Sequence, residues 1–367
     1  MEKVRVGVVG AGIRGGSQAK DFLEGVTERA ELAAICDTDP NVLKNWPMVP
    51  TFSSSEEMIR SGKVDAIYIA TPHYAHTTIG IDALKNGIHV LVEKPISVHK
   101  ADAERLIAAH YDNPKPVFAA MFNQRTDPHY IKVRELIQNG ELGEIRRTNW
   151  IITDWFRTEA YYASGGWRAT WKGEGGGVLL NQCPHNLDLF QWICGMPSKV
   201  QAYCAFGKYH DIEVEDDVTA YLEYPNGATG VFITTTGETP GTNRLEIVGD
   251  KGKIVVEGRS ITFQRNKVSM DVFRRETPLG FGRPESEMVE IDVEGRGPQH
   301  RGICQNFVDA ILDGVPLIAP AEEGIHSVEM ANAMLPSSML GQAVDVPIDG
   351  EIYEDKLRGL IAASKRA

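Results

Sequence analysis

The sequence contains few cysteines, a minority of basic residues and no long apolar run. Its five cysteines are odd in number and show no paired CxxC spacing, which argues against a disulfide framework and a structural zinc site. No apolar stretch approaches the ~20 residues that a membrane helix needs. With 38 Lys and Arg against 50 Asp and Glu, the formal net charge is −12, which disfavours binding to nucleic acids and anionic membranes.

These absences lead to expectations about location and partners. Cysteines without paired spacing favour a reducing compartment. The first three residues lead directly into an apolar run, so we expect no signal peptide. We therefore expect a cytoplasmic protein that binds no metal, no nucleic acid and no membrane.

The length and the composition indicate a folded protein of two domains. The chain has 367 residues, of which 42% are hydrophobic and 24% are charged, as is typical of globular proteins. A chain of this length exceeds the usual size of one domain and can bury two cores. We place a nucleotide-binding domain at residues 1–125 and a domain for substrate binding and oligomerisation at residues 126–367.

The beginning of the chain has the pattern of a dinucleotide-binding βαβ unit. A β-branched run, Val4 to Val9, is followed by a glycine-rich turn and a helical stretch, the context that makes a glycine motif informative. Gly10 permits a tight turn, Gly12 lets the backbone approach a pyrophosphate, and Gly15 lets helix and strand pack closely. The phosphates then contact free N–H groups at the helix start. The predicted cofactor contacts in this turn are Gly10, Gly12, Ile13, Arg14 and Gly15.

An acidic residue, Asp37, follows the second predicted strand, Ala30 to Cys36. A carboxylate at this place accepts hydrogen bonds from an adenosine ribose. It also repels a 2′-phosphate, so the sequence favours NAD over NADP. Arg14 is the competing signal, since it offers a partner for that phosphate.

Strand and helix signals alternate through the first domain. Apolar strands are predicted at 64–70, 89–92 and 116–121, and helices at 75–86 and 101–111, before a long helix at 128–139. This alternation predicts a doubly wound parallel sheet, that is, an α/β Rossmann domain.

Beyond residue 144 the pattern changes to strands without long helices between them. Strands are predicted at 145–152, 200–206, 217–224, 229–236, 244–248 and 253–256, and Asn226-Gly227 predicts a hairpin turn because both residues tolerate positive φ. The second domain is therefore predicted to be α+β, with a large, mainly antiparallel open sheet. Helices are predicted at 303–312 and 327–340, and the sequence leaves open whether they pack back on the first domain.

Two polar segments follow predicted strands of the first domain, where ligands of open α/β sheets bind. They are Thr71-Pro72-His73 and Glu93-Lys94-Pro95. Lys94 is the candidate for proton transfer, because partial burial beside the crevice lowers the pKa of a lysine. A surface lysine in a loop is the alternative interpretation. The predicted cofactor contacts in and beside these segments are Thr71, Pro72, His73, His76, Glu93 and Lys94.

A glycine run, Gly175 to Gly177, precedes an apolar segment that carries His185. If this segment is helical, Asn181 and Asp188 share a face with His185 and can contact substrate or orient the ring. A structural histidine is the alternative interpretation. Metal binding is disfavoured, because no second histidine lies at ligand spacing.

The segment 154–172 is dense in aromatic and basic residues. Aromatic rings pack against the apolar faces of sugars, while Arg and Lys donate to hydroxyl or carboxylate groups. An interface or a small loop core fits the same composition equally well. The remaining predicted substrate contacts are Tyr162, Trp167 and Arg168 from this loop, together with Arg125 and His300.

Three of these motifs, in this order and spacing, resemble the glucose-fructose oxidoreductase, inositol dehydrogenase and rhizopine-catabolism (Gfo/Idh/MocA) family. They are the turn Gly10–Gly15, the signature Glu93–Pro95 and the segment Gly175–His185, and the likeness covers nearly the whole chain. The resemblance implies that Lys94 and His185 are catalytic and flank a sugar or polyol. It also implies a homo-oligomer, a dimer or tetramer, that forms through the C-terminal sheet.

One position departs from the family pattern. Many dehydrogenases of this family have an aspartate four residues before the histidine, where this chain has Asn181. Asparagine cannot act as a base, but it can still exchange hydrogen bonds with a substrate hydroxyl. The departure puts the usual proton relay in question and leaves substrate binding intact.

The sequence thus predicts an NAD(P)-dependent dehydrogenase that acts on a hydroxyl-bearing carbon of a sugar, inositol or related polyol. One alternative is a redox-neutral enzyme that cleaves, eliminates or epimerises a sugar through a transient keto form, without net NADH. A second alternative is a non-catalytic sensor of NAD and sugar. The presence of both Lys94 and His185 argues against the sensor.

Overall fold

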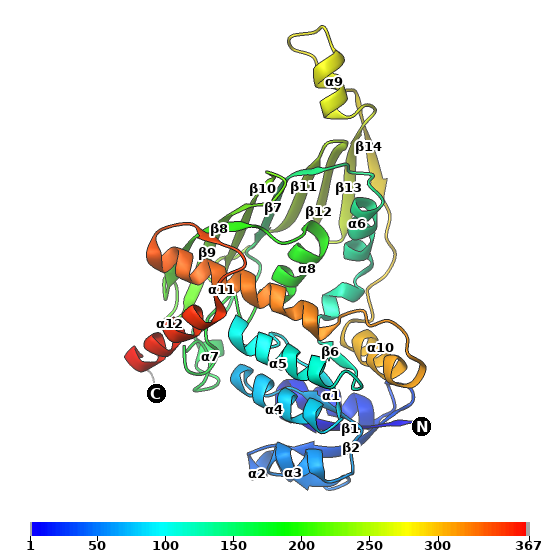
Figure 1. The fold of residues 1–367 in the computed structure, drawn as a ribbon, viewed down its shortest axis with the longest axis vertical. Helices are drawn as coiled ribbons and strands as arrows, with labels where there is room; N and C mark the ends of the chain where they lie inside the picture. The colour runs from blue at the N-terminus through cyan, green and yellow to red at the C-terminus, as the bar shows by residue number, and fades with distance from the viewer. Residues whose placement is uncertain (1, 365–367) are drawn as a thin grey trace.

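The computed structural model describes residues 2–364 and contains two β-sheets, each with its own apolar core. In Figure 1 the six-stranded sheet and its helices lie at the bottom of the molecule, and the nine-stranded sheet lies above them. The predicted combination of an α/β Rossmann domain with an α+β domain is confirmed.

The six-stranded sheet is entirely parallel and has the order β3-β2-β1-β4-β5-β6. Its strand order reverses beside β1, and ligands of such sheets bind in the crevice at this point. The strands are β1 (Val4–Val9), β2 (Ala30–Cys36), β3 (Thr51–Phe52), β4 (Ala66–Ile69), β5 (His89–Val92) and β6 (Phe118–Ala120). The helices are α1 (Ile13–Leu23), α2 (Pro40–Leu43), α3 (Ser55–Arg60), α4 (His73–Lys85), α5 (Lys100–Asp112) and the short η1 (Asn123–Thr126).

The nine-stranded sheet has the order β14-β13-β12-β11-β7-β10-β9-β8-β15. Of its strand pairs in the described chain, only β7 with β10 is parallel, so the sheet is mainly antiparallel as predicted. The strands are β7 (Ile145–Ile152), β8 (Lys199–Phe206), β9 (Glu215–Glu223), β10 (Thr229–Thr235), β11 (Asn243–Gly249), β12 (Gly252–Glu257), β13 (Ser260–Asn266), β14 (Ser286–Ile291) and β15 (Val344–Asp345). Strands β13, β14 and β15 were not predicted from the sequence.

The hairpin between β9 and β10 forms at the predicted dipeptide. Tyr224 O accepts a hydrogen bond from Gly227 N at 2.9 Å, and the Asn226 side chain accepts one from Ala228 N at 3.0 Å. Only Gly227 uses a positive φ, of 81°. The asparagine therefore stabilises the turn through its side chain and not through a left-handed backbone.

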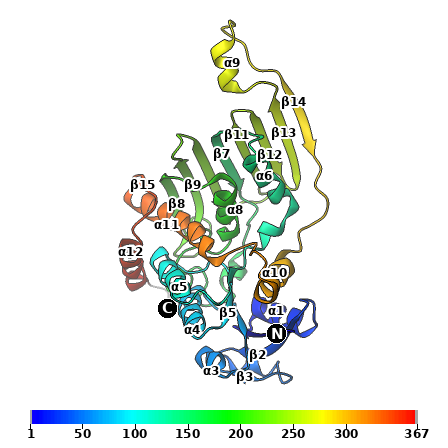
Figure 2. The same ribbon diagram turned by 45° about the vertical axis from the view of Figure 1, so that its right-hand side comes forward.

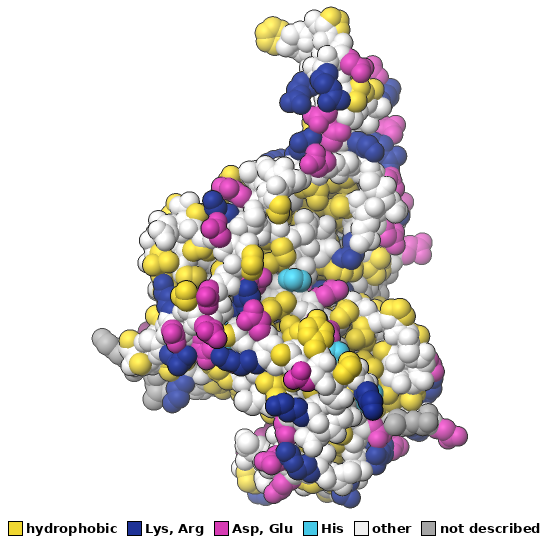
Figure 3. Space-filling model, viewed as in Figure 1, with side chains coloured by type: hydrophobic (Ala, Val, Ile, Leu, Met, Phe, Trp, Pro, Cys, Tyr) yellow, Lys and Arg dark blue, Asp and Glu magenta, His cyan; other side chains and the backbone are white. Residues whose placement is uncertain are grey.

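Three helices cover one face of the large sheet: α6 (Pro128–Gln138), α8 (Pro184–Cys194) and α11 (Gly324–Leu340) (Figure 2). Neighbouring strands on the sheet also leave large apolar side chains in solvent, with Tyr203 66% and Tyr221 42% exposed. The segment between β13 and β14 forms a projecting arm that contains α9 (Met270–Glu276). Figure 3 shows hydrophobic side chains at the tip of this arm, and Phe281, which lies between α9 and β14, is fully exposed.

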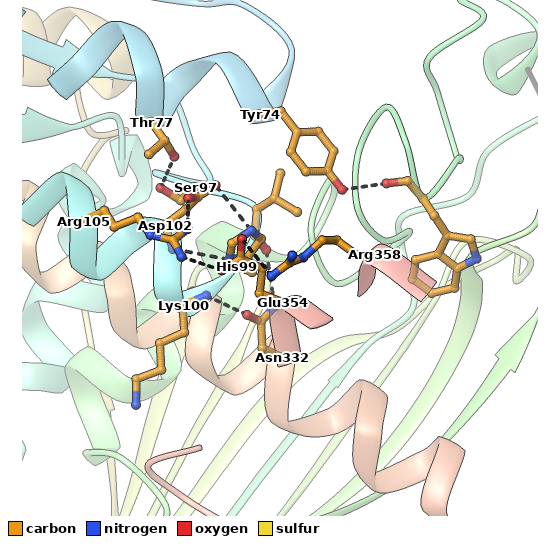
Figure 4. Close-up of polar contacts among 12 residues, drawn as sticks. Tyr74, Thr77, Ser97, His99, Lys100, Asp102, Arg105, Asn332, Glu354 and Arg358 are labelled. Carbon is orange, nitrogen blue, oxygen red and sulfur yellow. Dashed lines mark hydrogen bonds and ion pairs between the residues drawn. The ribbon is translucent and has the colours of Figure 1, made fainter. Parts of the chain in front are cut away.

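The end of the chain returns to the first domain. Helix α10 (Gln299–Asp313) places Ile303 and Phe307 in the core of the first domain. Helix α12 (Gly350–Ala363), which was not predicted, packs on α5. In Figure 4 the start of α5 faces α11 and α12: Lys100 N donates to Asn332 Oδ1 at 2.9 Å, and Arg105 pairs with Glu354 at 2.5 Å. Two shorter elements, α7 (Glu159–Tyr162) and η2 (Ala321–Glu323), complete the described helices.

A buried ion pair joins the first domain to α8. Arg125 of η1 donates from Nε to Asp188 Oδ2 at 2.8 Å and from Nη2 to Oδ1 at 2.6 Å. Both side chains are 1% exposed, and Glu323 makes a further contact with Arg125. The sequence predicts that Arg125 and Asp188 bind substrate. The structure does not support this, because the buried guanidinium takes the carboxylate as its counter-charge.

We predict that Asp188→Asn lowers the free energy of unfolding by about 3 kcal/mol, because it leaves the Arg125 charge buried without its main partner. Urea titration followed by circular dichroism measures this change. The matched control is Asp355→Asn, which removes an exposed pair with Arg358 and should change stability by less than about 1 kcal/mol. Equal effects of the two variants would show that the buried pair contributes no more than a surface pair.

Candidate active site

A cavity of about 710 Å³ lies at the carboxyl ends of β1, β2, β4 and β5 and is lined by both domains. From the first domain, its lining includes Gly10, Gly12, Ile13, Arg14, Asp37, Thr71, Pro72, His73, His76, Glu93 and Lys94. From the remainder of the chain, it includes Tyr161, Ser164, Trp167, Arg168, Asn181 and His300. Most of the predicted cofactor and substrate contacts therefore meet in one cavity.

The glycine turn has the geometry that each glycine was predicted to supply. Gly10 has φ of +84°, and a Cβ there would lie 2.7 Å from Ala70 O. A Cβ at Gly15 would lie 1.8 Å from Gly10 O, so Gly15 permits the helix to pack on the turn and does not line the cavity. No atom lies within 4 Å of a Cβ built at Gly12, which caps α1 without a side-chain hydrogen bond. The free N–H groups of the first turn of α1 therefore have the room and polarity to bind a phosphate.

The Asp37 carboxylate is fixed at the end of β2. Its Oδ2 accepts from Ala11 N at 2.8 Å and its Oδ1 accepts from Asp39 N at 2.9 Å. Each oxygen retains a second lone pair for a ligand hydroxyl. The charge that was predicted to favour NAD is thus held in the cavity wall.

Two buried polar atoms in the lining have no partner within the described chain. They are Nε of Arg14 and Oγ1 of Thr71. Buried donors of this kind are normally satisfied, and the phosphate, ribose and amide groups of a dinucleotide supply suitable acceptors. The turn, the helix start, Asp37 and these two orphaned atoms together fit a dinucleotide such as NAD.

Lys94 follows β5 and contacts the second domain. Its Nζ donates to Asn181 O at 2.7 Å. Burial lowers the pKa of Lys94, while the negative charges of Glu93 and Glu174 oppose that shift. Glu93 itself accepts from Tyr68 Oη and from Lys94 N, so its carboxylate is held by the protein. The amine that faces the cavity is therefore easier to deprotonate than an ordinary lysine.

His185 is the second residue of α8 and is not among the residues that line the cavity. Burial lowers the pKa of His185 well below its usual value, and the nearby charges of Lys94 and His300 add to this effect. Its Nδ1 is buried without a partner among the described residues, and the ring meets Phe122 edge-on at 6.4 Å. The imidazole is consequently neutral near pH 7 and has an unused nitrogen.

The glycine run does not belong to the helix that carries His185. Helix α8 begins at Pro184, and the segment before it consists of turns. The expectation that Asn181 and His185 share a helix face is therefore wrong, because Pro184 occupies the first turn, where proline begins a helix. Asn181 reaches the cavity from the preceding turn instead.

A set of polar contacts connects Asn181 to the aromatic loop. Tyr161 Oη donates to Asn181 Oδ1 at 3.3 Å, and Arg168 Nη1 donates to Tyr161 Oη at 3.0 Å. The Arg168 guanidinium lies 4.6 Å from the centroids of both Tyr161 and Trp167. The loop was predicted to supply Tyr162, but that side chain turns away and donates to Thr236 Oγ1 at 2.9 Å. Its neighbour Tyr161 lines the cavity in its place.

Two histidines complete the wall, and a buried acid, Glu174, lies behind it. His76 lies with its ring nitrogens 2.8 Å from Pro95 O and 2.8 Å from Thr71 O, so it is held by the backbone. The Nδ1 atom of His73 lies 3.2 Å from Glu174 O. Sequence reasoning missed Glu174, and the only signal was an acidic residue directly before the glycine run.

Residues 2–364 contain neither a cluster suited to a metal ion nor a helix suited to crossing a membrane. No cluster of three or more His, Cys, Asp or Glu side chains there is arranged to hold a metal ion. No helix of that part of the chain combines the length and apolarity that crossing a membrane requires.

Family models match both domains of the chain. Residues 4–121 match the oxidoreductase family with an NAD-binding Rossmann fold, and residues 130–255 match the GFO/IDH/MocA C-terminal domain. Inositol 2-dehydrogenase of Corynebacterium glutamicum strain R is 32% identical over 198 residues, 53% of this chain and 55% of that protein. The alignment thus spans about half the length of this relative. Inositol 2-dehydrogenase of Rhizobium meliloti is 25% identical over 91% of this chain and 96% of its own length.

Solved structures match over a greater length. The WlbA dehydrogenase from Bordetella pertussis, in complex with NADH and UDP-GlcNAcA, has a TM-score of 0.81 and 26% identity over 95% of this chain and 99% of its own. Levoglucosan dehydrogenase in complex with NADH and L-sorbose shares the fold, with a TM-score of 0.78 and 20% identity over 94% and 99% of the two chains. With both domain models matched and the dinucleotide turn in place, the chain belongs to the GFO/IDH/MocA oxidoreductase family, and its first domain is an NAD-binding Rossmann domain.

Proposed function

We propose that the protein transfers hydride reversibly between NAD and a hydroxyl-bearing carbon of a sugar, inositol or related polyol. One observation carries the proposal: Lys94, whose pKa is lowered by burial, lies in the same cavity as the dinucleotide turn and the polar groups of the second domain. The inositol 2-dehydrogenases and the WlbA dehydrogenase among the relatives support this class of substrate.

Bound NAD supplies the carbon that accepts or returns the hydride. We assign the hydroxyl proton to Lys94, because its amine faces the cavity and its lowered pKa increases the fraction of neutral base. We assign hydrogen bonding at the reacting oxygen to His185, as the family resemblance implies; its ring is neutral and has an unused nitrogen, but it does not line the cavity, so substrate contact requires the ring to become exposed there. Asn181, Trp167, Arg168 and His300 are proposed to bind the hydroxyl groups and the apolar face of the substrate.

The NAD preference, the assembly state and the location belong to this proposal as well. The fixed Asp37 carboxylate supports NAD over NADP. The exposed Tyr203 and Tyr221 support self-association of the large sheet into a dimer or tetramer. The five cysteines form no disulfide, which supports a reducing, cytoplasmic location.

The purified protein should reduce NAD in the presence of one member of a panel of inositols, aldoses, uronates and glycosides. Absorbance of the reduced nicotinamide follows the reaction, and product analysis runs in parallel. Product without NADH would instead indicate the redox-neutral enzyme. If neither NADH nor any product forms, although calorimetry shows that NAD binds, the result would contradict both enzymatic functions for the substrates of this panel.

Lys94→Met should lower kcat by at least ~100-fold, the usual contribution of a general acid or base, while NAD still binds. In the native protein, kcat/KM for oxidation should rise with pH through a pKa below 10.5, because burial favours the neutral amine. This rise of kcat/KM with pH should be absent in Lys94→Met. Lys172→Met is the control, since Lys172 is exposed in the same region, and equal rates for both variants would contradict the assignment.

Asp37→Asn should raise the ratio of kcat/KM for NADP over NAD by about tenfold, because it removes the negative charge that repels a 2′-phosphate. The ratio is measured with each cofactor at a fixed substrate concentration. Asp39→Asn is the control, since Asp39 caps α2 through its side chain and asparagine caps equally well. An unchanged ratio in Asp37→Asn would argue against the role of this carboxylate.

A further inference from the structure

Glu174 is a buried acid that does not line the cavity but contacts Asn181, which does. Glu174 is 1% exposed, and its carboxylate forms no ion pair within residues 2–364. Its Oε2 accepts from Ala169 N at 2.6 Å, and its Oε1 accepts from Asn181 Nδ2. A buried carboxylate without a paired cation is costly: burial raises the pKa of Glu174, whereas the hydrogen bonds from Ala169 and Asn181 and the charges of Arg168 and Lys94 oppose that shift.

The backbone around Glu174 is shaped to turn this carboxylate inward. Ala169 has a φ of 51° and Gly175 a φ of 76°, on either side of the acid. A Cβ at Gly173 would lie 2.0 Å from Trp167 O. The segment therefore closes on itself so tightly that only glycine fits there, and left-handed backbone is used at two further positions.

The hydrogen bond from Asn181 to Glu174 fixes the orientation of the Asn181 amide. With Nδ2 directed to Glu174, Oδ1 is directed to Tyr161 Oη, and the backbone oxygen of Asn181 accepts from Lys94 Nζ. The acid thus lies one side chain behind Asn181, the position at which the family resemblance implies an aspartate.

We propose that Glu174 is a positioning residue that holds the Asn181 side chain and supplies, from behind it, the negative charge near Lys94 that Asn181 lacks. The inference rests on the proposed function only in that Lys94 transfers the substrate proton. The two carboxylates that act on Lys94 are Glu93 and Glu174, and both raise the pKa of its amine. Each carboxylate already accepts two hydrogen bonds within the protein, and Glu93 has the larger effect on Lys94, so loss of Glu174 removes the smaller of two comparable contributions.

Other groups also face this pair, and substitutions at positions 174 and 181 leave all of them in place. Around Lys94 they are Cys183, Arg157, His73, His76, His185 and His300. Around Glu174 they are Arg168, His73 and Glu215.

The test is a charge exchange between residues 174 and 181, read out by titrating Lys94 directly. Lysines are methylated reductively with ¹³C, and the Lys94 signal, assigned with Lys94→Arg, is followed against pH by NMR in the ligand-free protein. Glu174→Gln should lower the Lys94 midpoint by about one pH unit. The double variant Glu174→Gln/Asn181→Asp should restore it, because the amide introduced at position 174 can donate to the new carboxylate. Glu213→Gln is the matched control, since Glu213 accepts from Trp171 N at 2.8 Å in the same loop but does not contact Asn181.

An unchanged midpoint in Glu174→Gln, or an equal shift in Glu213→Gln, overturns the proposal. If Glu174→Gln does not fold, the double variant decides: a native midpoint supports the proposal and a lowered one overturns it. With NADH and the ketone formed from a panel substrate, at a pH above the Lys94 midpoint, kcat for reduction should fall about tenfold in Glu174→Gln, because less of the Lys94 ammonium remains to act as the acid, and should recover in the double variant. The NMR titration needs no turnover, so failure of the proposed dehydrogenase activity leaves this result readable.

Discussion

A buried ion pair between Arg125 and Asp188 holds the second domain against the first beside the active site. Arg125 lies directly after the last strand of the Rossmann sheet, and Asp188 lies in the helix that carries His185. A guanidinium and a carboxylate that are both 1% exposed tolerate little separation, because each is the counter-charge of the other. This contact, made outside the cavity, helps to hold the helix that carries His185 against the first domain, together with the contacts of α10, α11 and α12.

The parts of the site that the sequence predicted are those that depend on neighbouring residues in the chain. Gly10, Gly12 and Gly15 were identified because a strand, a turn and a helix follow one another directly, and their geometry agrees with the roles expected of them. Lys94 was identified because parallel strands all present their carboxyl ends to one crevice. For these residues, the succession of strand, turn and helix along the sequence is enough to predict their positions in the fold.

The parts that the sequence could not predict depend on contacts between distant segments. Nothing in the pattern distinguishes Tyr161 from Tyr162, and only the fold decides which ring faces the cavity. Arg125 and Asp188 look like exposed polar residues until the chain brings them together. The importance of Glu174 becomes visible only through the hydrogen bond that it accepts from the Asn181 side chain. The strands β13, β14 and β15 were missed for a similar reason, since their stability comes from neighbours that the alternation of residues does not specify.

Helix α11 contributes to the apolar cores of both domains at once. Val328 packs in the first core, whereas Met330, Ala331 and Met334 pack in the second. A helix shared in this way cannot leave one core without exposing apolar surface in the other. The two domains are thereby coupled into a single cooperative unit, in which a cofactor that stabilises the first domain also protects the second against melting and proteolysis.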